Sequence, residues 1–220
     1  MLLGGHTLLK RAVDTLRGVP SLKDTSGRVT VTIVGERAEL EGADRVIVDR
    51  YAGCGPLGGM ETALGDLESS GDVEWAFFMP VDMPFLSFGP IEGLLREWVE
   101  ACARGARVCH VIVEGRPQPL VSLMHRTVRP FMVQALTAGE FKVTPVLQSA
   151  GEVLASSYAD RIGSGLHTTH GGQDTLAFPG AGWTVTGEQE QLKRVWFSNL
   201  NTEQDFLEAE TFIAAMGSTR

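Results

Sequence analysis

VIVD at Val46–Asp49, followed by CGPLGGM at Cys54–Met60, is the stretch of sequence that decides the fold. A short apolar run that ends in an acidic residue is typical of a buried parallel strand. Glycines let the backbone approach a ligand closely, and the N–H groups at the start of the following helix suit an anion such as phosphate. The stretch therefore predicts a strand, a ligand loop and a helix. A tight strand-to-helix turn without a ligand is the alternative.

The composition is that of an ordinary globular protein. Of 220 residues, 43% are hydrophobic and 21% charged, which fits one α/β domain with a sizeable core. The net charge of −8 argues against binding to nucleic acid, although a nucleotide could still be held locally. We expect no membrane partner because no run of about 18 apolar residues is present. The amino terminus does not resemble a signal peptide, and three cysteines without CxxC spacing favour reduced thiols in a cytoplasmic protein.

Strands and helices alternate in the first half of the chain. Hydrophobic periodicity predicts helices at residues 7–17, 57–69 and 90–104, and strands at residues 29–34, 45–49 and 74–79. This alternation argues for a parallel, doubly wound sheet.

The pattern changes after residue 104. It predicts strands at 108–114 and 120–124 around a turn, helices at 128–138 and 143–149, a last short strand at 195–197 and a terminal helix at 202–215. Thr202 should cap that terminal helix, with Asp205 at its third position. Residues 156–187 are rich in Gly, Ser and Thr and are predicted to form a loop or insertion. Without a repeat or a linker, residues 1–220 are expected to form a single domain.

Further candidate residues follow other predicted strands. Asp82 lies in MPVDMP (Met79–Pro84), directly after the strand at 74–79, and Asn199–Asp205 (NLNTEQD) precedes the last helix. Open α/β sheets bind ligands at the carboxyl ends of their strands, so Asp82, like Asp49, is a candidate for a ligand site. Arg116, in the turn at 115–119, could meet an anionic group, although a surface turn arginine is the simpler reading.

Together, GPLGG at 55–59, DMPFL at 82–86, GRPQPLV at 115–121 and NLNT at 199–202 resemble the molybdenum cofactor guanylyltransferases, which are MobA-like nucleotidyltransferases. The resemblance runs from Met1 to about Leu207. It implies a Rossmann-like three-layer nucleotidyltransferase fold of the nucleotide-diphospho-sugar transferase type, with a mostly parallel sheet. It also implies attack by the terminal phosphate of the molybdopterin cofactor on the α-phosphorus of GTP, with release of pyrophosphate.

The same resemblance implies the roles of individual residues. Asp82 corresponds to the catalytic carboxylate that holds Mg²⁺, and Asp49 to an aspartate that contacts the nucleotide. The residues implied in binding GTP or the pterin are Asp49, Gly55, Pro56, Leu57, Gly58, Gly59, Asp82, Asn199 and Asn201. The implied partners are GTP, a molybdopterin-type cofactor and molybdoenzyme maturation proteins.

Each of these residues also has a plainer structural interpretation. Asp82 could be a solvated or helix-capping aspartate. Leu57 could serve packing rather than contact, and Asn and Thr at 199–202 are good turn and cap residues without any ligand.

The resemblance breaks at the amino end. The family opens with a strand and a loop of the form LAGGxSxRMGxDK, whose backbone and lysine grip the triphosphate. Met1–Leu9 corresponds to the segment after that motif, so Gly4-Gly5 is not the signature glycine pair. The first, central strand has no counterpart, which should leave unpaired main-chain groups on two strands and open an apolar slot. Either the natural start lies upstream or the protein is a degenerate relative, and we expect low stability.

Two further functions stay open. A sister cytidylyltransferase, or another MobA-like NTP transferase, would share the fold, and Val34-Gly35 lacks the polar residue that often contacts the base in the family. A non-catalytic relative that has lost triphosphate binding is the alternative from another class.

Overall fold

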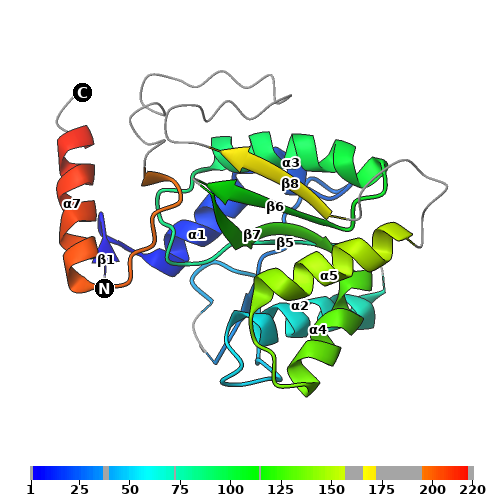
Figure 1. Cartoon of the computed structure of the whole chain (residues 1–220). Coiled ribbons are helices and arrows are strands. Elements are labelled where there is room, and N and C mark those ends of the chain that lie inside the picture. Colours follow the sequence, from blue (N-terminus) through cyan, green and yellow to red (C-terminus); the bar gives the residue numbers. More distant parts are fainter. Residues whose placement is uncertain are drawn as a thin grey trace.

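The structure is a computed structural model of the chain, and it describes residues 2–36, 40–71, 73–113, 115–156, 166–171 and 195–217. Helices cover both faces of a central sheet, with α3 on one side and α2, α4 and α5 on the other (Figure 1). The helices are α1 (Leu8–Arg17), α2 (Pro56–Ser70), α3 (Phe88–Ala103), α4 (Arg129–Thr137), α5 (Val143–Ser156) and α7 (Glu203–Gly217), with 3-10 turns at Pro20–Leu22 and Arg126–Val128.

The strands of the described residues form three small sheets. They are β1 (Leu2–Leu3), β2 (His6–Thr7), β3 (Thr32–Val34), β4 (Arg45–Ile47), β5 (Trp75–Phe78), β6 (Val108–Val113), β7 (Arg116–His125) and β8 (Leu166–Gly171). The largest sheet has the order β5-β7-β6-β8, and the two others pair β1 with β2 and β3 with β4.

The four-stranded sheet is mixed, and a mostly parallel sheet is not confirmed for the described strands. The neighbouring strands β6 and β8 are parallel, while β7 is antiparallel to both of its neighbours, β5 and β6. The reason is a tight hairpin: Gly115, with φ +74°, turns the chain directly from β6 into β7. The turn predicted for 115–119 is thus mostly strand, because β7 already begins at Arg116. Further along the hairpin, the register between β6 and β7 shifts between His110 and Val111.

Strand β8 lies within the segment predicted as a loop or insertion at 156–187. It pairs in parallel with β6, with Leu166 opposite Val108 and Gly171 opposite Val113. Periodicity missed it because its partner strand lies more than fifty positions earlier in the sequence, where no local pattern points to it. The rest of the predicted insertion lies outside the described residues, apart from Ser156.

The predicted strand at 195–197 is also wrong. Trp196 is fully buried in the same hydrophobic cluster as Trp98, and the chain turns there, with the Ser198 N–H donating to the Val195 carbonyl (3.1 Å). Residues 195–197 resemble a strand in composition because Trp196 is a core residue, and they pair with no strand. The terminal helix α7 is confirmed, with its amino end capped by Thr202, whose hydroxyl accepts from the Asp205 N–H (3.2 Å).

The amino-terminal residues form a small hairpin and then α1. Gly4 and Gly5 have φ of +58° and +81° and make the turn between β1 and β2, which agrees with the view that they are no phosphate-binding pair. Helix α1 begins as predicted, with Thr7 accepting from the Lys10 N–H (3.0 Å). The hairpin packs beside α7, where Leu3 is buried against Phe85 (Figure 1).

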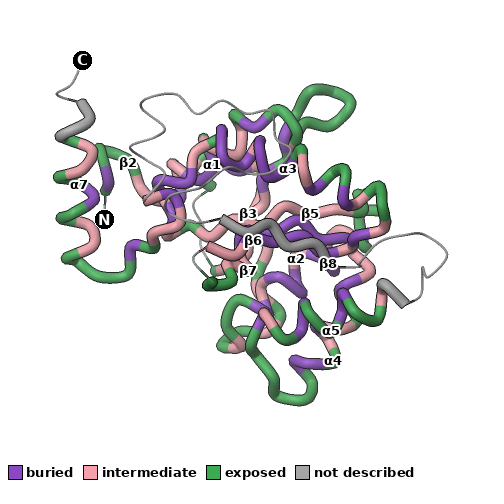
Figure 2. Tube along the Cα trace, turned by 45° about the horizontal axis from the view of Figure 1, so that its top comes forward, coloured by how far each residue is buried: buried purple, intermediate pink, exposed green. Residues whose placement is uncertain are grey.

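The expected apolar slot is present. Within the described chain, β3 pairs only with β4, and β5 pairs only with β7, so one edge of each strand has no partner. A cavity of about 860 Å³ lies between these edges, lined also by α1 and α2. Both strands are traced in the intermediate burial colour in Figure 2, whereas β6 begins fully buried. The core is thus split into a larger part around β5–β8 and a smaller part of α1 with Val29 and Val31.

The structure also describes the cysteines and the length of the helices. The cysteines are free thiols, as expected. In the part of the chain that the structure describes, no helix is both long and apolar enough to cross a bilayer.

Candidate functional site

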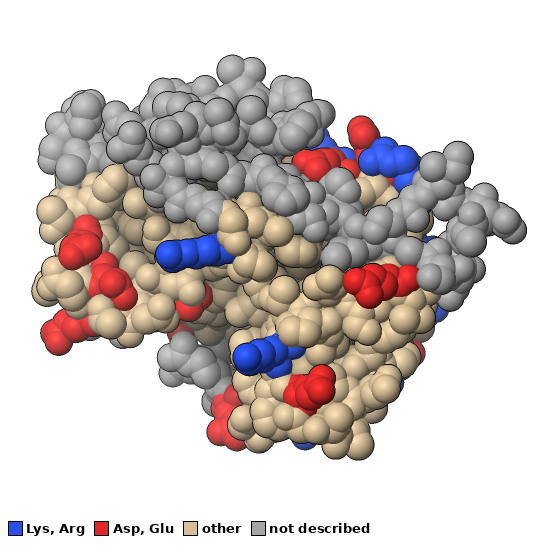
Figure 3. Space-filling view, viewed as in Figure 1, with Lys and Arg blue, Asp and Glu red and all other residues tan. Residues whose placement is uncertain are grey.

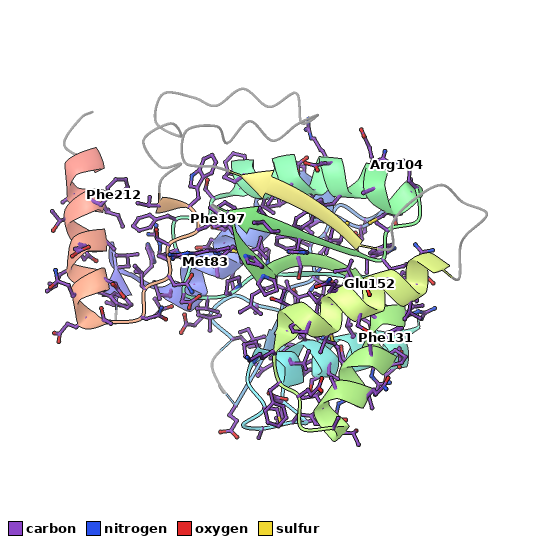
Figure 4. The ribbon with its side chains drawn as sticks, viewed as in Figure 1. Met83, Arg104, Phe131, Glu152, Phe197 and Phe212 are labelled. Carbon is purple, nitrogen blue, oxygen red and sulfur yellow. The ribbon has the colours of Figure 1, made fainter. Side chains whose placement is uncertain are left out.

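The loop after β5 and the segment before α7 lie against each other, although more than a hundred residues separate them in the sequence. The Leu200 N–H donates to the Asp82 carbonyl (2.8 Å), which ties the two segments together. Met83 and Phe197 belong to one hydrophobic cluster, and Figure 4 shows them near each other at the same end of the sheet. Two of the sequence-predicted loops therefore meet at one place.

Asp82 is the most unusual carboxylate in this region. Its Oδ1 atom is buried and has no hydrogen-bond partner among the described residues. Desolvation by burial raises the pKa of Asp82, because the low-dielectric surroundings disfavour the charged form. Asp82 is half-buried, and a buried oxygen without a partner is costly, so a cation or a donor supplied by a ligand would stabilise its Oδ1 atom.

A metal ion bound to Asp82 would take most of its ligands from groups other than protein side chains. No group of three or more His, Cys, Asp or Glu side chains that could hold a metal occurs among the described residues. Mg²⁺ is usually held by only one or two carboxylates, and phosphate oxygens and waters complete its octahedron. Asp82 alone therefore suits Mg²⁺ carried in with a phosphate ligand.

Asp49 has a clear structural task at the end of the β4 segment. Its Oδ1 accepts from the Tyr51 N–H (2.8 Å) and from the Thr62 hydroxyl (3.3 Å), and Thr62 in turn accepts from the Arg50 N–H (3.0 Å). These bonds tie the loop at 49–51 to α2. Asp49 thus shapes the loop that leads to the helix, which sequence reasoning about nucleotide contact did not foresee.

The glycine loop opens α2 as predicted. Gly55 has φ +66° and is the N-cap residue, and Pro56 occupies the first turn. Leu57 is fully buried against Met60 and Leu64 of the same cluster, which supports packing as its role. Gly58 lies so close to Tyr51 that a Cβ atom would be 2.8 Å from the Tyr51 carbonyl oxygen. The close approach of loop and helix therefore requires glycine at 58.

We expect Gly58→Ala to destabilise the protein by about 1 to 3 kcal/mol, because the new methyl group would collide with the Tyr51 backbone. Gly59→Ala is the matched control: its Cβ would meet only Val34 Cγ1 at 3.6 Å, an ordinary contact. Alanine there should be neutral or add about 0.5 to 1 kcal/mol through helix propensity. Urea unfolding of both variants tests this. Equal destabilisation would show that the loop does not pack on α2 as described.

A buried ion-pair network behind the loop was not predicted. Glu61 is fully buried in α2, where its Oε1 accepts from Arg129 Nε (2.7 Å), and Arg50 lies 3.4 Å away. Gly65 makes room, since a Cβ there would overlap the Arg50 guanidinium. The signal in the sequence was a glutamate between apolar positions of α2, but its partner Arg129 is 68 residues away.

The late asparagines are exposed at the start of α7. Asn199 and Asn201 are both exposed, and the Asn201 and Thr202 N–H groups donate to the Asp205 carboxylate (2.8 Å each). The capping interpretation is thus supported for this turn, while both amide side chains remain available to a ligand beside Asp82. Arg116 is exposed at the tip of the β6–β7 hairpin.

The charges on this side of the molecule give no broad basic surface. In Figure 3 acidic side chains gather at the left, and the basic side chains in view are scattered, some of them beside acidic ones.

The protein has an α/β fold, and the loop after β5 meets the segment before α7 at the carboxyl end of β5. Open α/β sheets hold their ligands at this end of their strands. Residues 1–154 match the family model of the MobA-like NTP transferase domain, and the chain belongs to that family.

Individual relatives agree with this family. The chain is 23% identical over 214 residues to a probable molybdenum cofactor guanylyltransferase of Bacillus cytotoxicus. This match covers 94% of this chain and 84% of the relative. It is 31% identical over 140 residues to the protein of the same description from Geobacillus sp., and it spans only 58% of that relative's length.

A solved structure is similar in fold. Molybdopterin-guanine dinucleotide biosynthesis protein A from Archaeoglobus fulgidus has a TM-score of 0.62 at 17% identity, and the match covers 98% of this chain and 89% of that one. The resemblance found in the four motifs is confirmed, and so is an α/β fold of the MobA-like kind.

Proposed function

We propose that the protein transfers GMP from GTP to the molybdenum–molybdopterin cofactor and releases pyrophosphate. The observation that carries the proposal is Asp82, a half-buried carboxylate whose Oδ1 atom is buried without a described hydrogen-bond partner, in a loop bonded to the NLNT segment. The family and the names of its relatives support the reaction class. One domain, residues 1–220, would carry the reaction, with strand ends arranged as in the Rossmann-like nucleotidyltransferases.

The residues have distinct parts in this proposal. Asp82 holds Mg²⁺, which when bound supplies charge neutralisation to the phosphate oxygens. Gly55–Gly59 let the backbone at the start of α2 approach the nucleotide, and Asp49 keeps that loop against the helix. Asn199 and Asn201 face the pterin side from the segment bonded to Asp82.

The chemistry asks for placement more than for covalent participation by the protein. The terminal phosphate of the pterin attacks the α-phosphorus of GTP in line with the departing pyrophosphate. Holding both substrates in that geometry supplies much of the rate enhancement. No side chain needs to form a bond to phosphorus.

For the nucleobase there is a specific alternative, which is CTP in place of GTP. Val34 ends β3 and Gly35 follows it, at the point where the family often has a polar base contact, and neither residue has a polar side chain. This favours a relaxed base preference or a CTP-using relative. We place the reaction in the cytoplasm, in keeping with the three free thiols, and molybdoenzyme maturation proteins would receive the product.

A competition experiment tests these points. The protein isolated from its own cells is given molybdopterin cofactor with equal GTP and CTP, and the dinucleotide products are separated by mass. We expect the guanine dinucleotide to dominate and EDTA to abolish its formation. A cytosine dinucleotide would assign the protein to the sister activity, and turnover that survives EDTA would contradict the role of Mg²⁺.

A further inference from the structure

Two of the three cysteine sulfurs lie in contact with each other beside the four-stranded sheet. The Sγ atoms of Cys102 and Cys109 are 3.8 Å apart, and either thiol can donate a weak hydrogen bond to the other. Cys102 lies in the last turn of α3, and Cys109 is the second residue of β6. Figure 4 labels Arg104 at this end of α3 and Met83 well away from it, beside the candidate site. The sulfur pair therefore lies outside the site proposed for the nucleotide.

The two thiols differ in their exposure to solvent. Cys109 is fully buried, whereas Cys102 is only partly buried. A small solute can thus reach the Cys102 sulfur, while the Cys109 sulfur stays covered by protein. An accessible sulfur in contact with a second one is the arrangement in which an oxidised cysteine is converted to a disulfide.

The groups around the pair favour Cys102 as the nucleophile. A hydrogen bond from Cys109 lowers the pKa of Cys102, and so does the positive charge of Arg107. The same hydrogen bond and burial raise the pKa of Cys109, as do the negative charges of the Cys102 thiolate and of Glu97. Because the thiolate is the reactive form of cysteine, Cys102 is the sulfur that attacks and Cys109 the one that keeps its proton.

The charge that acts on Cys102 is held in place by the sheet. The Arg107 Cζ atom lies 5.8 Å from the centre of the Trp75 ring, within the range of a cation–π contact. Its main-chain carbonyl accepts from the His125 N–H (2.9 Å), which ties the start of β6 to the end of β7. Arg107 is therefore a fixed part of the surroundings of this thiol.

Joining the two sulfurs needs only a small movement. They would have to approach by roughly 1.8 Å to reach the length of an S–S bond. Cys109 cannot shift easily, because it lies in β6 between Leu123 of β7 and His167 of β8. Cys102 can, because α3 ends one residue later and Gly105 follows in open space with φ +110°. The movement therefore falls on the last turn of α3.

We propose that Cys102 and Cys109 form a reversible redox site that reacts with hydrogen peroxide. The Cys102 thiolate attacks one peroxide oxygen, the O–O bond breaks, and Cys102 becomes a sulfenic acid. The leaving hydroxide takes up the proton that Cys102 gave up on ionising, which yields the first water. The Cys109 sulfur then attacks the Cys102 sulfur; the S–S bond forms, the S–O bond breaks, and hydroxide leaves with the Cys109 proton as the second water. The two thiols lose two electrons in all, and the peroxide gains them.

The disulfide has two physical consequences. It ties the last turn of α3 to β6, and it spares Cys102 from oxidation to the sulfinic acid, which thiols do not reverse. A thiol reductant reopens the bond by exchange, so that in a reducing compartment the disulfide is transient. This inference goes beyond the proposed function and does not rest on it, because masses and peptide links report on it without any activity.

Peptide mapping of the folded protein tests the proposal. The protein is treated with hydrogen peroxide, its remaining thiols are alkylated, and it is digested with trypsin. Cleavage after Arg104 and Arg107 places the two sulfurs in separate peptides, 97–104 and 108–126. We expect these two peptides to be linked and the intact mass to fall by about 2 Da, the two hydrogens lost, until dithiothreitol restores both.

Cysteine variants separate the two steps. Cys109→Ala should leave Cys102 as a sulfenic acid that dimedone traps, and longer exposure should add two or three oxygens to it. Cys102→Ala should form neither the link nor the trapped acid. Cys54→Ala is the matched control, because Cys54 packs in the other hydrophobic cluster, beside α2, and its loss should leave the link unchanged.

An arginine pair tests the activation of Cys102. Arg107→Met should slow formation of the disulfide by about 3- to 10-fold, because the thiolate loses its positive neighbour. Arg104→Met is the control: Arg104 is also close to Cys102 in the sequence, but it pairs with Glu100 (3.9 Å) and should leave the rate unchanged. Equal rates in both variants would contradict the role of Arg107.

Other outcomes would overturn the proposal. A link that involves Cys54, a link between two copies of the chain, or a link that forms only in urea would show that the two sulfurs do not meet in the native fold. Further oxidation of Cys102 at the same rate in wild type and in Cys109→Ala would show that Cys109 does not resolve the sulfenic acid. An intact mass that stays unchanged in peroxide would show that the pair does not react.

Discussion

Replacing Asp82 by asparagine is expected to lower nucleotidyl transfer by about 100- to 1,000-fold, the usual effect of losing one pre-placed electrostatic group in a transition state. Asparagine keeps the shape of the side chain but removes the charge that we propose holds Mg²⁺. The measurement is the rate of pyrophosphate release at saturating GTP. Asp14→Asn is the control, because Asp14 is exposed on α1 and pairs only with Lys10. Full activity in the Asp82 variant would contradict the role of this carboxylate.

The same substitution should make the metal-free protein more stable at neutral pH. Burial raises the pKa of Asp82, so the native state holds this proton more tightly than the unfolded chain does. The stability that the protonated group contributes is therefore full below its ordinary pKa of 3.8 and is lost as pH rises through the raised value. The gain in melting temperature of Asp82→Asn over wild type should accordingly grow as pH rises from 3.8 through the raised pKa of Asp82, and should level off above it.

Arg129→Met is expected to cost about 3 kcal/mol or more, because it leaves the fully buried Glu61 without its nearest charge partner. Arg126→Met is the matched control. Arg126 pairs with Glu74, whose side chain is 54% exposed, so its removal should cost at most about 1 kcal/mol.

Urea unfolding at neutral pH separates the two arginine variants. A large loss for Arg129→Met alone would show that the network between α2 and α4 anchors the helix behind the glycine loop. Equal, small losses would show that Arg50, 3.4 Å from Glu61, is a sufficient partner.

The elements with strong local signals could be predicted from the sequence. Thr202 caps α7 as expected, α1 begins at the predicted place, and so does α2 at Gly55-Pro56. The slot was also expected, because the family resemblance implies a first, central strand that has no counterpart in this sequence.

The elements decided by distant partners could not be predicted. Pro117 and Pro119 indicated a turn, yet β7 runs through them, paired with β6 on both sides of a register shift that leaves residues 119–121 of β7 without a partner in β6. Strand β8 exists through its pairing with β6, and Trp196 reads as strand although it anchors a turn in the core. Each of these depends on contacts that no local pattern contains.

The candidate site shows the same division. The position of Asp82 after a strand was enough to propose it, while its buried, unpartnered oxygen became visible only in the structure. The contact between Asp82 and Leu200 brings together two motifs that the sequence could only associate through a family resemblance. The ion pair between Glu61 and Arg129 was missed because 68 residues separate the two in the sequence.

The most direct test of the central claim follows the nucleotide itself. The protein isolated from its own cells is incubated with GTP labelled at the α-phosphorus, Mg²⁺ and molybdopterin cofactor, and the label is traced after separation of the products. We predict that the label moves into a pterin–guanine dinucleotide, with one pyrophosphate released for each transfer. A folded protein that moves no label from GTP or CTP to the cofactor would contradict the assignment and favour a non-catalytic member of the family.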